Sequence, residues 1–156
     1  MSVQDLLLHI AASVVVVIAL AICIGASAPR WPKTWLQRDV GPLRFNRFDT
    51  RSRYRKIGIT KLARRLPELG AVFGGQSKSA LPGVTNADLV TYLIEVRRAE
   101  WVHWLTLLVW LPLIFFDPWW LTLLFAFMVI AGNTIYIAIL RHNRLRLTGI
   151  LESREA

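Results

Sequence analysis

Two long apolar blocks, residues 6–26 and 101–140, constrain the fold of this chain more than any other feature of its sequence. The hydrocarbon core of a bilayer is about 30 Å thick, and a helix of about 20 apolar residues can cross it. The first block is long enough for one crossing and the second for two. The sequence therefore predicts an all-α integral membrane protein whose first spanning helix covers residues 5–26.

The second block is divided by Pro112 and by the sequence Asp117-Pro118, which is typical of a turn. Two tryptophans follow this turn directly, as expected of an aromatic belt at a membrane interface. We therefore predict a helical hairpin whose second arm spans the membrane over residues 119–140, followed by a cytoplasmic tail, residues 141–156.

The first arm of the hairpin begins with a recognisable helix start. Thr85 and Asp88 have the spacing of a capping box, in which the side chains at both positions satisfy backbone amides of the first turn. We expect one unbroken helix over residues 86–116, amphipathic in its first three turns and membrane-spanning in the remainder. With the first helix, this gives three spanning helices in a single membrane domain.

The distribution of charge predicts the orientation of these helices. The chain has 19 Lys and Arg against 10 Asp and Glu, a net charge of +9. The loop over residues 27–84 and the tail carry most of the positive charge, and both would lie on the same side of the membrane. Because basic loops stay in the cytoplasm, we predict an outside N-terminus and an inside C-terminus.

Residues 5–26 resemble a retained helix more than a signal peptide, because the helix start carries Asp5 and the basic residues follow the apolar run. Ala26-Ser27-Ala28 nevertheless has the composition of a cleavage site, so processing stays an alternative. The loop over residues 27–84 interleaves aromatic residues with arginines. This pattern favours short interfacial helices and turns that bind anionic lipid or a lipid-linked substrate, rather than RNA.

Polar side chains within the hairpin form the candidate site. His103 lies about 20 Å from the hairpin turn and Asn133 about 21 Å from it, at ~1.5 Å per residue, so the two should face each other on antiparallel helices. By the same reasoning Glu100 comes level with Tyr136. Closer to the cytoplasm, Glu95 and Arg98 on the first arm come level with Arg141 and Asn143 on the second.

Each of these residues also has a purely structural explanation. Glu95, Arg98 and Glu100 could be a salt-bridged surface, and Arg97, Arg141 and Arg144 anchors that extend to the interface. His103 could be a packing residue and Asn133 a hydrogen-bonding contact between helices. Because ionisable groups are costly within lipid, their coincidence in depth favours a functional site over these separate explanations.

The pattern of these residues resembles a known family. The residues that carry the resemblance are Glu95-x-x-Arg98-Ala99-Glu100-x-x-His103-Trp104, Asn133, and Arg141-x-Asn143-Arg144-x-Arg146-Leu147, with a weaker likeness over residues 54–59 and on to residues 66–68. They are similar to the glycosyl-4,4'-diaponeurosporenoate acyltransferases, bacterial membrane enzymes that acylate the sugar of a carotenoid glycoside. The resemblance implies a multi-pass protein of the bacterial inner membrane that acylates this or a related glycolipid.

The chemistry of acyl transfer suggests a role for each residue. His103 is the candidate general base, Glu100 its acidic partner, and Asn133 the donor to the developing oxyanion. Acyl-CoA or another anionic acyl donor is expected as co-substrate, with no bound cofactor and no metal. The expected contacts with donor and substrate are Glu95, Arg98, Tyr136, Arg141, Asn143 and Arg144.

Direct transfer is favoured over a covalent serine intermediate, because the sequence contains no Gly-x-Ser-x-Gly motif. The His-x-x-x-x-Asp motif of other acyltransferases is also absent, since Leu108 occupies the acidic position after His103. Two alternatives stay open: a non-catalytic subunit or scaffold of a larger membrane complex, and a membrane lipid methyltransferase. The sequence leaves homo-oligomerisation undecided.

Overall fold

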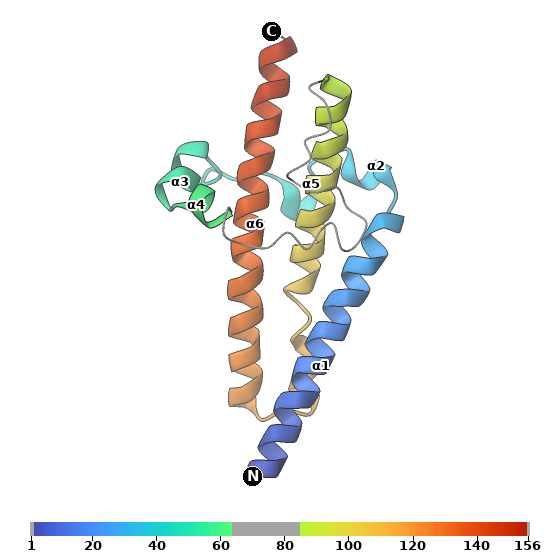
Figure 1. Cartoon of the computed structure of the whole chain (residues 1–156), viewed down its shortest axis with the longest axis vertical. Coiled ribbons are helices and arrows are strands. Elements are labelled where there is room, and N and C mark those ends of the chain that lie inside the picture. Colours follow the sequence, from blue (N-terminus) through green and yellow to red (C-terminus); the bar gives the residue numbers. More distant parts are fainter. Residues whose placement is uncertain (1, 64–84, 156) are drawn as a thin grey trace.

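The computed structural model describes residues 2–63 and 85–155, and in these two ranges the chain is helical without any β-strand. Three long helices lie side by side: α1 (Val3–Ser27), α5 (Asn86–Thr106) and α6 (Trp119–Glu155). Figure 1 shows α5 between the other two, with the N-terminus and the α5–α6 turn at one end and the C-terminus at the other. We call these the hairpin end and the C-terminal end. The predicted all-α class is confirmed for this part of the chain.

Local sequence signals explain where the long helices begin. Ser2 and Asp5 form a capping box at the start of α1, and Thr85 and Asp88 form the predicted one at the start of α5. In each box the hydroxyl accepts the backbone N–H three residues later, while the carboxylate accepts that of the cap residue. These contacts satisfy amide groups that have no partner within the helix.

The prediction of one unbroken helix over residues 86–116 is wrong. α5 ends at Thr106, and a short 3-10 helix, η4 (Leu111–Phe115), leads into the turn. Pro112 has no N–H, and its ring would clash with the carbonyl group of Leu108, so α-helical geometry cannot pass through it. The chain instead tightens before the proline, where the amide of Val109 donates to the carbonyl of Thr106 at 3.3 Å.

Two helices in the described ranges are long and apolar enough to cross a membrane, not the three that we predicted. They cover Val3–Arg30 and Trp119–Arg154, and the most apolar 18-residue stretches within them have mean hydropathies of 2.9 and 2.3. α6 also continues through residues 141–155, which we predicted as a separate tail. Leu147, within this extension, belongs to the same buried apolar cluster as Leu89 and Leu93 of α5, so the continuation has a structural reason.

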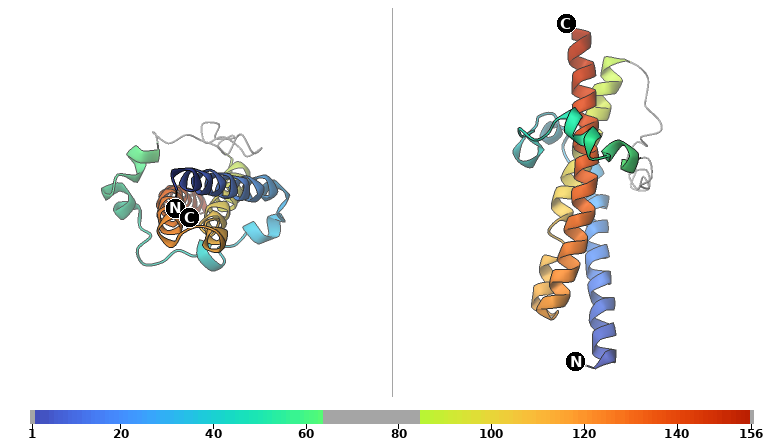
Figure 2. Two further views of the ribbon diagram at one scale, coloured as in Figure 1. Left: turned by 90° about the horizontal axis from the view of Figure 1, so that it is seen from below. Right: turned by 90° about the vertical axis from the view of Figure 1, so that its left-hand side faces the viewer.

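Short helices surround the bundle between its middle and its C-terminal end. They are η1 (Ala28–Arg30), α2 (Lys33–Leu36), η2 (Gly41–Leu43), α3 (Arg51–Lys56) and α4 (Ile59–Ala63). Figure 2 shows them as a ring when the molecule is viewed along the long helices. Gly41 and Gly58 adopt positive φ angles of 53° and 77°, which allows the ring to turn sharply between its helices. The prediction of short helices and turns is confirmed for residues 28–63.

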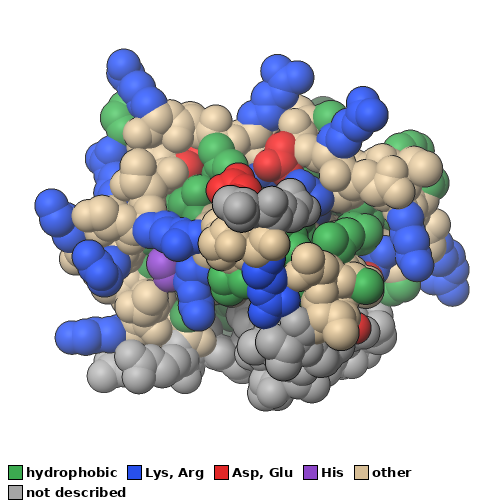
Figure 3. All heavy atoms as spheres, turned by 90° about the horizontal axis from the view of Figure 1, so that it is seen from above, with side chains coloured by type: hydrophobic (Ala, Val, Ile, Leu, Met, Phe, Trp, Pro, Cys, Tyr) green, Lys and Arg blue, Asp and Glu red, His purple; other side chains and the backbone are tan. Residues whose placement is uncertain are grey.

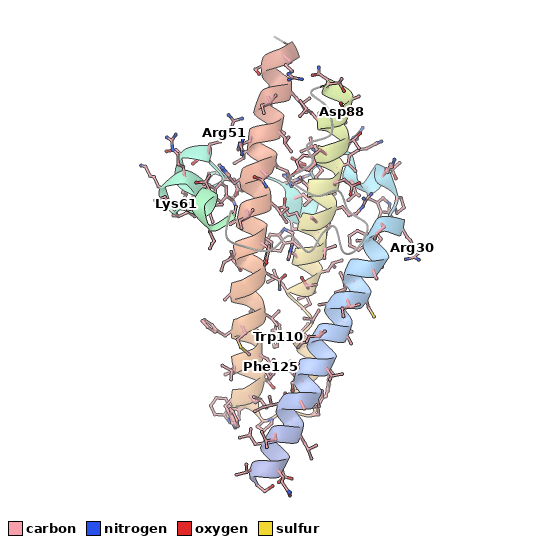
Figure 4. All side chains as sticks on the ribbon, viewed as in Figure 1. Arg30, Arg51, Lys61, Asp88, Trp110 and Phe125 are labelled. Carbon is pink, nitrogen blue, oxygen red and sulfur yellow. The ribbon has the colours of Figure 1, made fainter. Side chains whose placement is uncertain are left out.

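Three small apolar clusters hold the helices together. One joins α5 to α6, and a second joins α3 and α4 to α6 through Tyr54, Ile59 and Ile139. The third lies near the hairpin end and includes Trp110 and Phe125, which are labelled in Figure 4. Outside these clusters, many large apolar side chains of α1 and α6 are exposed at the surface.

Candidate active site

His103 of α5 and Asn133 of α6 are in direct contact, as their equal predicted depth required. His103 Nδ1 lies 2.8 Å from Asn133 Oδ1, and the hydroxyl of Thr106 lies 2.6 Å from the same oxygen. The amide nitrogen of Asn133 donates to the carbonyl of Val129 at 2.9 Å, one turn earlier in α6. Both ends of the Asn133 amide are therefore engaged within the protein.

These contacts determine which nitrogen of His103 carries the proton. The nitrogen of the Asn133 amide must face Val129, because two carbonyl oxygens cannot form a hydrogen bond with each other. The amide oxygen then faces His103, so Nδ1 must be the donor of this pair. In the neutral imidazole Nε2 is consequently the unprotonated nitrogen, which can accept a proton.

Tyr136 stacks on the His103 ring, with the ring centroids 4.8 Å apart and the planes inclined by 3°. The sequence placed Tyr136 level with Glu100 instead. The difference follows from the direction of helical side chains, which point toward the N-terminus of their own helix. Because α5 and α6 are antiparallel, this tilt brings the side chains of His103 and Tyr136 toward each other.

Glu100 is completely buried and binds two arginines of α6 rather than His103. Its carboxylate accepts from Arg141 Nε at 3.0 Å and from Arg144 Nη1 at 2.7 Å. Trp104 adds a longer contact, with its indole nitrogen 3.4 Å from the same carboxylate. The predicted pairing of Glu100 with His103 is thus replaced by a salt-bridged connection between α5 and α6.

The same arginines bind the ring of short helices. Arg141 donates to Asp49 at 2.5 Å, and Arg144 donates to Asp39 at 3.2 Å, which also accepts from Arg97 at 2.7 Å. Backbone carbonyls of residues 42–44 satisfy further guanidinium donors. We call the alternating set Asp49, Arg141, Glu100, Arg144, Asp39 and Arg97 the charge chain; it joins both helices to the ring.

Asp49 is the member of the charge chain that links it to α3. Burial by itself would raise the pKa of the Asp49 carboxyl, but hydrogen bonds from the Asn46 backbone, Tyr54 and Arg141 lower it below its ordinary value. Burial and the neighbouring carboxylate raise the pKa of Tyr54 above its usual range, so its hydroxyl stays protonated and donates to Asp49. Asp49 is therefore held in its charged form.

The remaining predicted residues lie at the edge of this arrangement. Glu95 and Arg98 form an ion pair with each other within one turn of α5. Asn143 is half-buried on α6 and is not part of the charge chain. In the described ranges, no group of three or more His, Cys, Asp or Glu side chains could hold a metal ion.

Several site residues were not foreseen from the sequence. Thr106 and the carbonyl of Val129 had no distinguishing pattern. Asp39 and Asp49 did carry a signal, because they are the two acidic residues among the many lysines and arginines of residues 28–63. Acidic residues in such a basic segment are natural partners for buried arginines elsewhere in the fold.

Comparison with known proteins identifies the family to which this geometry belongs. A sequence model of the family described as glycosyl-4,4'-diaponeurosporenoate acyltransferase matches residues 32–153. The chain belongs to this family. It is therefore an enzyme of the acyltransferase class, and the scaffold and methyltransferase alternatives are set aside. No curated protein and no solved structure matches the chain.

The match to the glycosyl-4,4'-diaponeurosporenoate acyltransferase family extends from α2 to α6 and includes the His103–Asn133 contact and the charge chain. Residues 66–68, which contributed to the resemblance, lie inside the match but outside the described ranges. α1 precedes the matched residues, yet it is joined to them at the hairpin end.

A second set of polar contacts in the acyltransferase joins α1 to the hairpin and is centred on Asp117. The sequence indicated this residue only as part of a turn. Its side chain is completely buried and lies 3.0 Å from His9 Nδ1. The hydroxyl of Ser13 donates to it at 2.5 Å. α1 is thus attached to the hairpin by polar contacts as well as by Val16 and Val17 of the apolar cluster.

Proposed function

We propose that this acyltransferase moves a fatty acyl group directly from an activated donor to a sugar hydroxyl of a carotenoid glycoside or a related glycolipid, with His103 as general base. The observation that carries the proposal is the Asn133 amide held between His103 Nδ1 and the Val129 carbonyl. It presents Nε2 as the basic nitrogen, as an orienting residue does for a catalytic histidine.

In this mechanism His103 Nε2 takes the proton of the sugar hydroxyl while the hydroxyl oxygen attacks the acyl carbonyl carbon. The tetrahedral intermediate then expels the thiolate or alkoxide of the donor, which receives the proton from the imidazolium. The new ester bond replaces the broken thioester or ester bond, so atoms and protons balance. Tyr136 supports the ring by stacking, and Asn133 stabilises the imidazolium through Nδ1–H.

Asn133 therefore has a different role from the oxyanion donor that its position suggested, because its amide nitrogen is used by Val129. Glu100 acts as a positioning residue, since it joins α5 to α6 one turn away from His103 through Arg141 and Arg144. For contact with an anionic donor such as acyl-CoA, we propose Arg98, its ion-pair partner Glu95, and Asn143 of α6; all three are half-buried.

We further propose that the bundle is embedded in the inner membrane, with α1 and residues 119–140 of α6 as spanning segments. Support comes from their hydropathy and from the large apolar side chains exposed along both helices. The end of α5 and the broken chain over residues 107–116 would together cross beside them, in an N-outside, C-inside arrangement. Asn133 would then lie about 10 Å inside the apolar end of α6 at residue 140, at ~1.5 Å per residue, which suits a lipid-linked acceptor.

A matched pair of histidine substitutions tests the catalytic assignment. Purified protein in detergent is incubated with labelled acyl-CoA and a panel of glycosylated carotenoid acids and glycolipids. His103→Phe keeps an aromatic ring against Tyr136 but removes the base, so we expect a loss of about 100-fold or more in kcat. His142→Phe is the control, because His142 is buried beside Tyr54 and its ring nitrogens have no hydrogen-bond partner in the described ranges.

The role of Asn133 has a separate readout. Asn133→Asp places a carboxylate against the imidazole and should shift the acidic limb of the kcat–pH profile upward, because a negative neighbour raises the pKa of histidine. Equal activity of His103→Phe and the parent enzyme would refute the general base. An unchanged pH profile in Asn133→Asp, with His103→Phe inactive, would refute only the orienting role.

A further inference from the structure

The ring of short helices, residues 28–63, carries far more positive than negative charge. Its basic residues are Arg30, Lys33, Arg38, Arg44, Arg47, Arg51, Arg53, Arg55, Lys56 and Lys61, whereas its acidic residues are Asp39 and Asp49. We call this segment the basic collar. Charge of one sign at this density indicates an anionic partner.

The two acidic residues of the basic collar do not neutralise the collar's own basic residues. Asp49 binds Arg141, and Asp39 binds Arg97 and Arg144, all of which come from α5 and α6. The collar therefore directs its negative charge inward to the charge chain. Of its basic residues, Arg51 also points inward, donating to the carbonyl of Leu145 at 2.6 Å.

The other basic residues of the collar are exposed, and none of them forms an ion pair with the described part of the chain. Figure 3, which views the molecule from its C-terminal end, shows lysine and arginine side chains projecting outward around much of the rim. Lys61 and Arg30, labelled in Figure 4, lie on opposite sides of the bundle. The outer surface of the collar is therefore a band of positive charge without ion-pair partners among the described residues.

Large apolar side chains are exposed within the same band. Trp35 is 64% exposed, Ile57 62% and Phe48 50%. The guanidinium groups of Arg47 and Arg53 both lie over the Phe48 ring, 4.8 and 4.9 Å from its centroid. Exposed apolar groups beside cations suit the boundary between lipid headgroups and acyl chains.

The position of the collar favours a lipid surface over a nucleic acid. It begins where α1 ends and surrounds the bundle near the end of the apolar part of α6 (Figure 2). Its exposed apolar residues thus continue the exposed apolar surfaces of the long helices. RNA could also stack on aromatics and bind arginines, but it would not explain this continuity.

We propose that the basic collar binds the phosphate headgroups of anionic phospholipids, with Trp35, Phe48 and Ile57 inserted at the boundary with the acyl chains. The proposal uses the membrane placement given above but is independent of the acyl-transfer chemistry. It adds a lipid-binding surface to the enzyme and predicts that anionic lipid determines how deeply the bundle lies in the membrane.

The full-length protein in neutral detergent tests this by titration with phosphatidylglycerol or phosphatidylcholine, with lipid binding followed by native mass spectrometry. We expect tighter binding of phosphatidylglycerol. The double variant Arg47→Gln/Arg53→Gln should weaken it by at least fivefold, about the effect of one charge near an anionic surface. The control Arg146→Gln/Arg154→Gln removes the same charge from exposed positions of α6, which are not part of the collar segment, and should bind as the parent does.

The proposal would be overturned by equal binding of both lipids, by equal loss in both double variants, or by displacement of phosphatidylglycerol by RNA at a lower concentration than by lipid. Inorganic phosphate is a further competitor, and complete displacement by millimolar phosphate would show binding of a free anion rather than a lipid surface. Acyl transfer measured on the same variants separates the two proposals. Unchanged phosphatidylglycerol binding in Arg47→Gln/Arg53→Gln would refute only the collar, whereas weaker binding with normal activity supports the collar and leaves the acyl-transfer chemistry unaffected.

Discussion

Replacing Glu100 by glutamine tests whether the charge chain holds the two helices of the active site together. Glu100 and Arg144 are completely buried, and Glu100 accepts from Arg144 at 2.7 Å and from Arg141 at 3.0 Å. Glutamine has nearly the same shape, but its amide nitrogen is a donor and would face a guanidinium group. The substitution removes the carboxylate that Arg141 and Arg144 share, so the buried positive charge exceeds the negative charge by one.

The expected loss in the free energy of unfolding is about 3 kcal/mol, the lower end of the range for removing one partner of a buried ion pair. The lower end applies because Arg141 keeps Asp49 and Arg144 keeps Asp39. Thermal unfolding in detergent should show a decrease of about 6–12 °C in the midpoint, at ~2–4 °C per kcal/mol for a chain of this size. Activity should also fall, since the contact of His103 with Asn133 depends on the register of α5 and α6.

Glu95→Gln is the matched control on the same helix. Glu95 is half-buried and paired with Arg98 within one turn, so its replacement should cost about 0.5 kcal/mol. The double variant Glu100→Gln/Arg144→Gln should lose less stability than the sum of the single variants, because the two side chains interact directly. Equal midpoints for Glu100→Gln and Glu95→Gln would refute the reasoning.

Three further substitutions test other parts of the fold. Thr85→Ala should cost about 1 kcal/mol in the free energy of unfolding, because it removes the cap of α5; circular dichroism during unfolding measures this, and an unchanged stability would contradict the capping contact. Asp117→Asn should cost about 1–3 kcal/mol by weakening the contacts with α1, and limited proteolysis should then cut α1 free more rapidly than in a His9→Gln control. The pKa of Asp49 lies below its ordinary value of 3.8, so this carboxylate stabilises the folded state above that pH, and its contribution is lost as the pH falls below it. Asp49→Asn should therefore reduce the acid dependence of the unfolding midpoint. Identical curves of midpoint against pH for the variant and the parent would disprove this role of Asp49.

Local sequence was sufficient to predict several elements of this fold. The apolar blocks predicted α1 and the membrane-length part of α6, because the length of a continuous apolar run is a property of the sequence alone. The capping box at Thr85 and Asp88 and the turn at Asp117-Pro118 were predicted for the same reason. Even the contact of His103 with Asn133 followed from counting residues away from one turn, since rise per residue is nearly constant in helices.

The extent of the helices was less predictable. Pro112 ended α5 earlier than expected, because its effect reaches back to the carbonyl of the preceding turn. At the other end, packing of Leu147 against α5 extended α6 well beyond its apolar part. Both differences come from contacts along or between helices that an average apolar pattern does not contain.

The partners of the charged residues were decided by the tertiary structure. Spacing along α5 placed Glu100 near His103, yet its carboxylate binds Arg141 and Arg144, whose long side chains reach back toward the start of α6. A long flexible side chain can reach several carboxylates, and the choice depends on which of them is buried beside it. The sequence by itself determined where the long helices begin, the position of the turn and the level of the site. Only the packed structure determined where α5 and α6 end, and that Asp39 and Asp49 of the collar point inward to complete the charge chain.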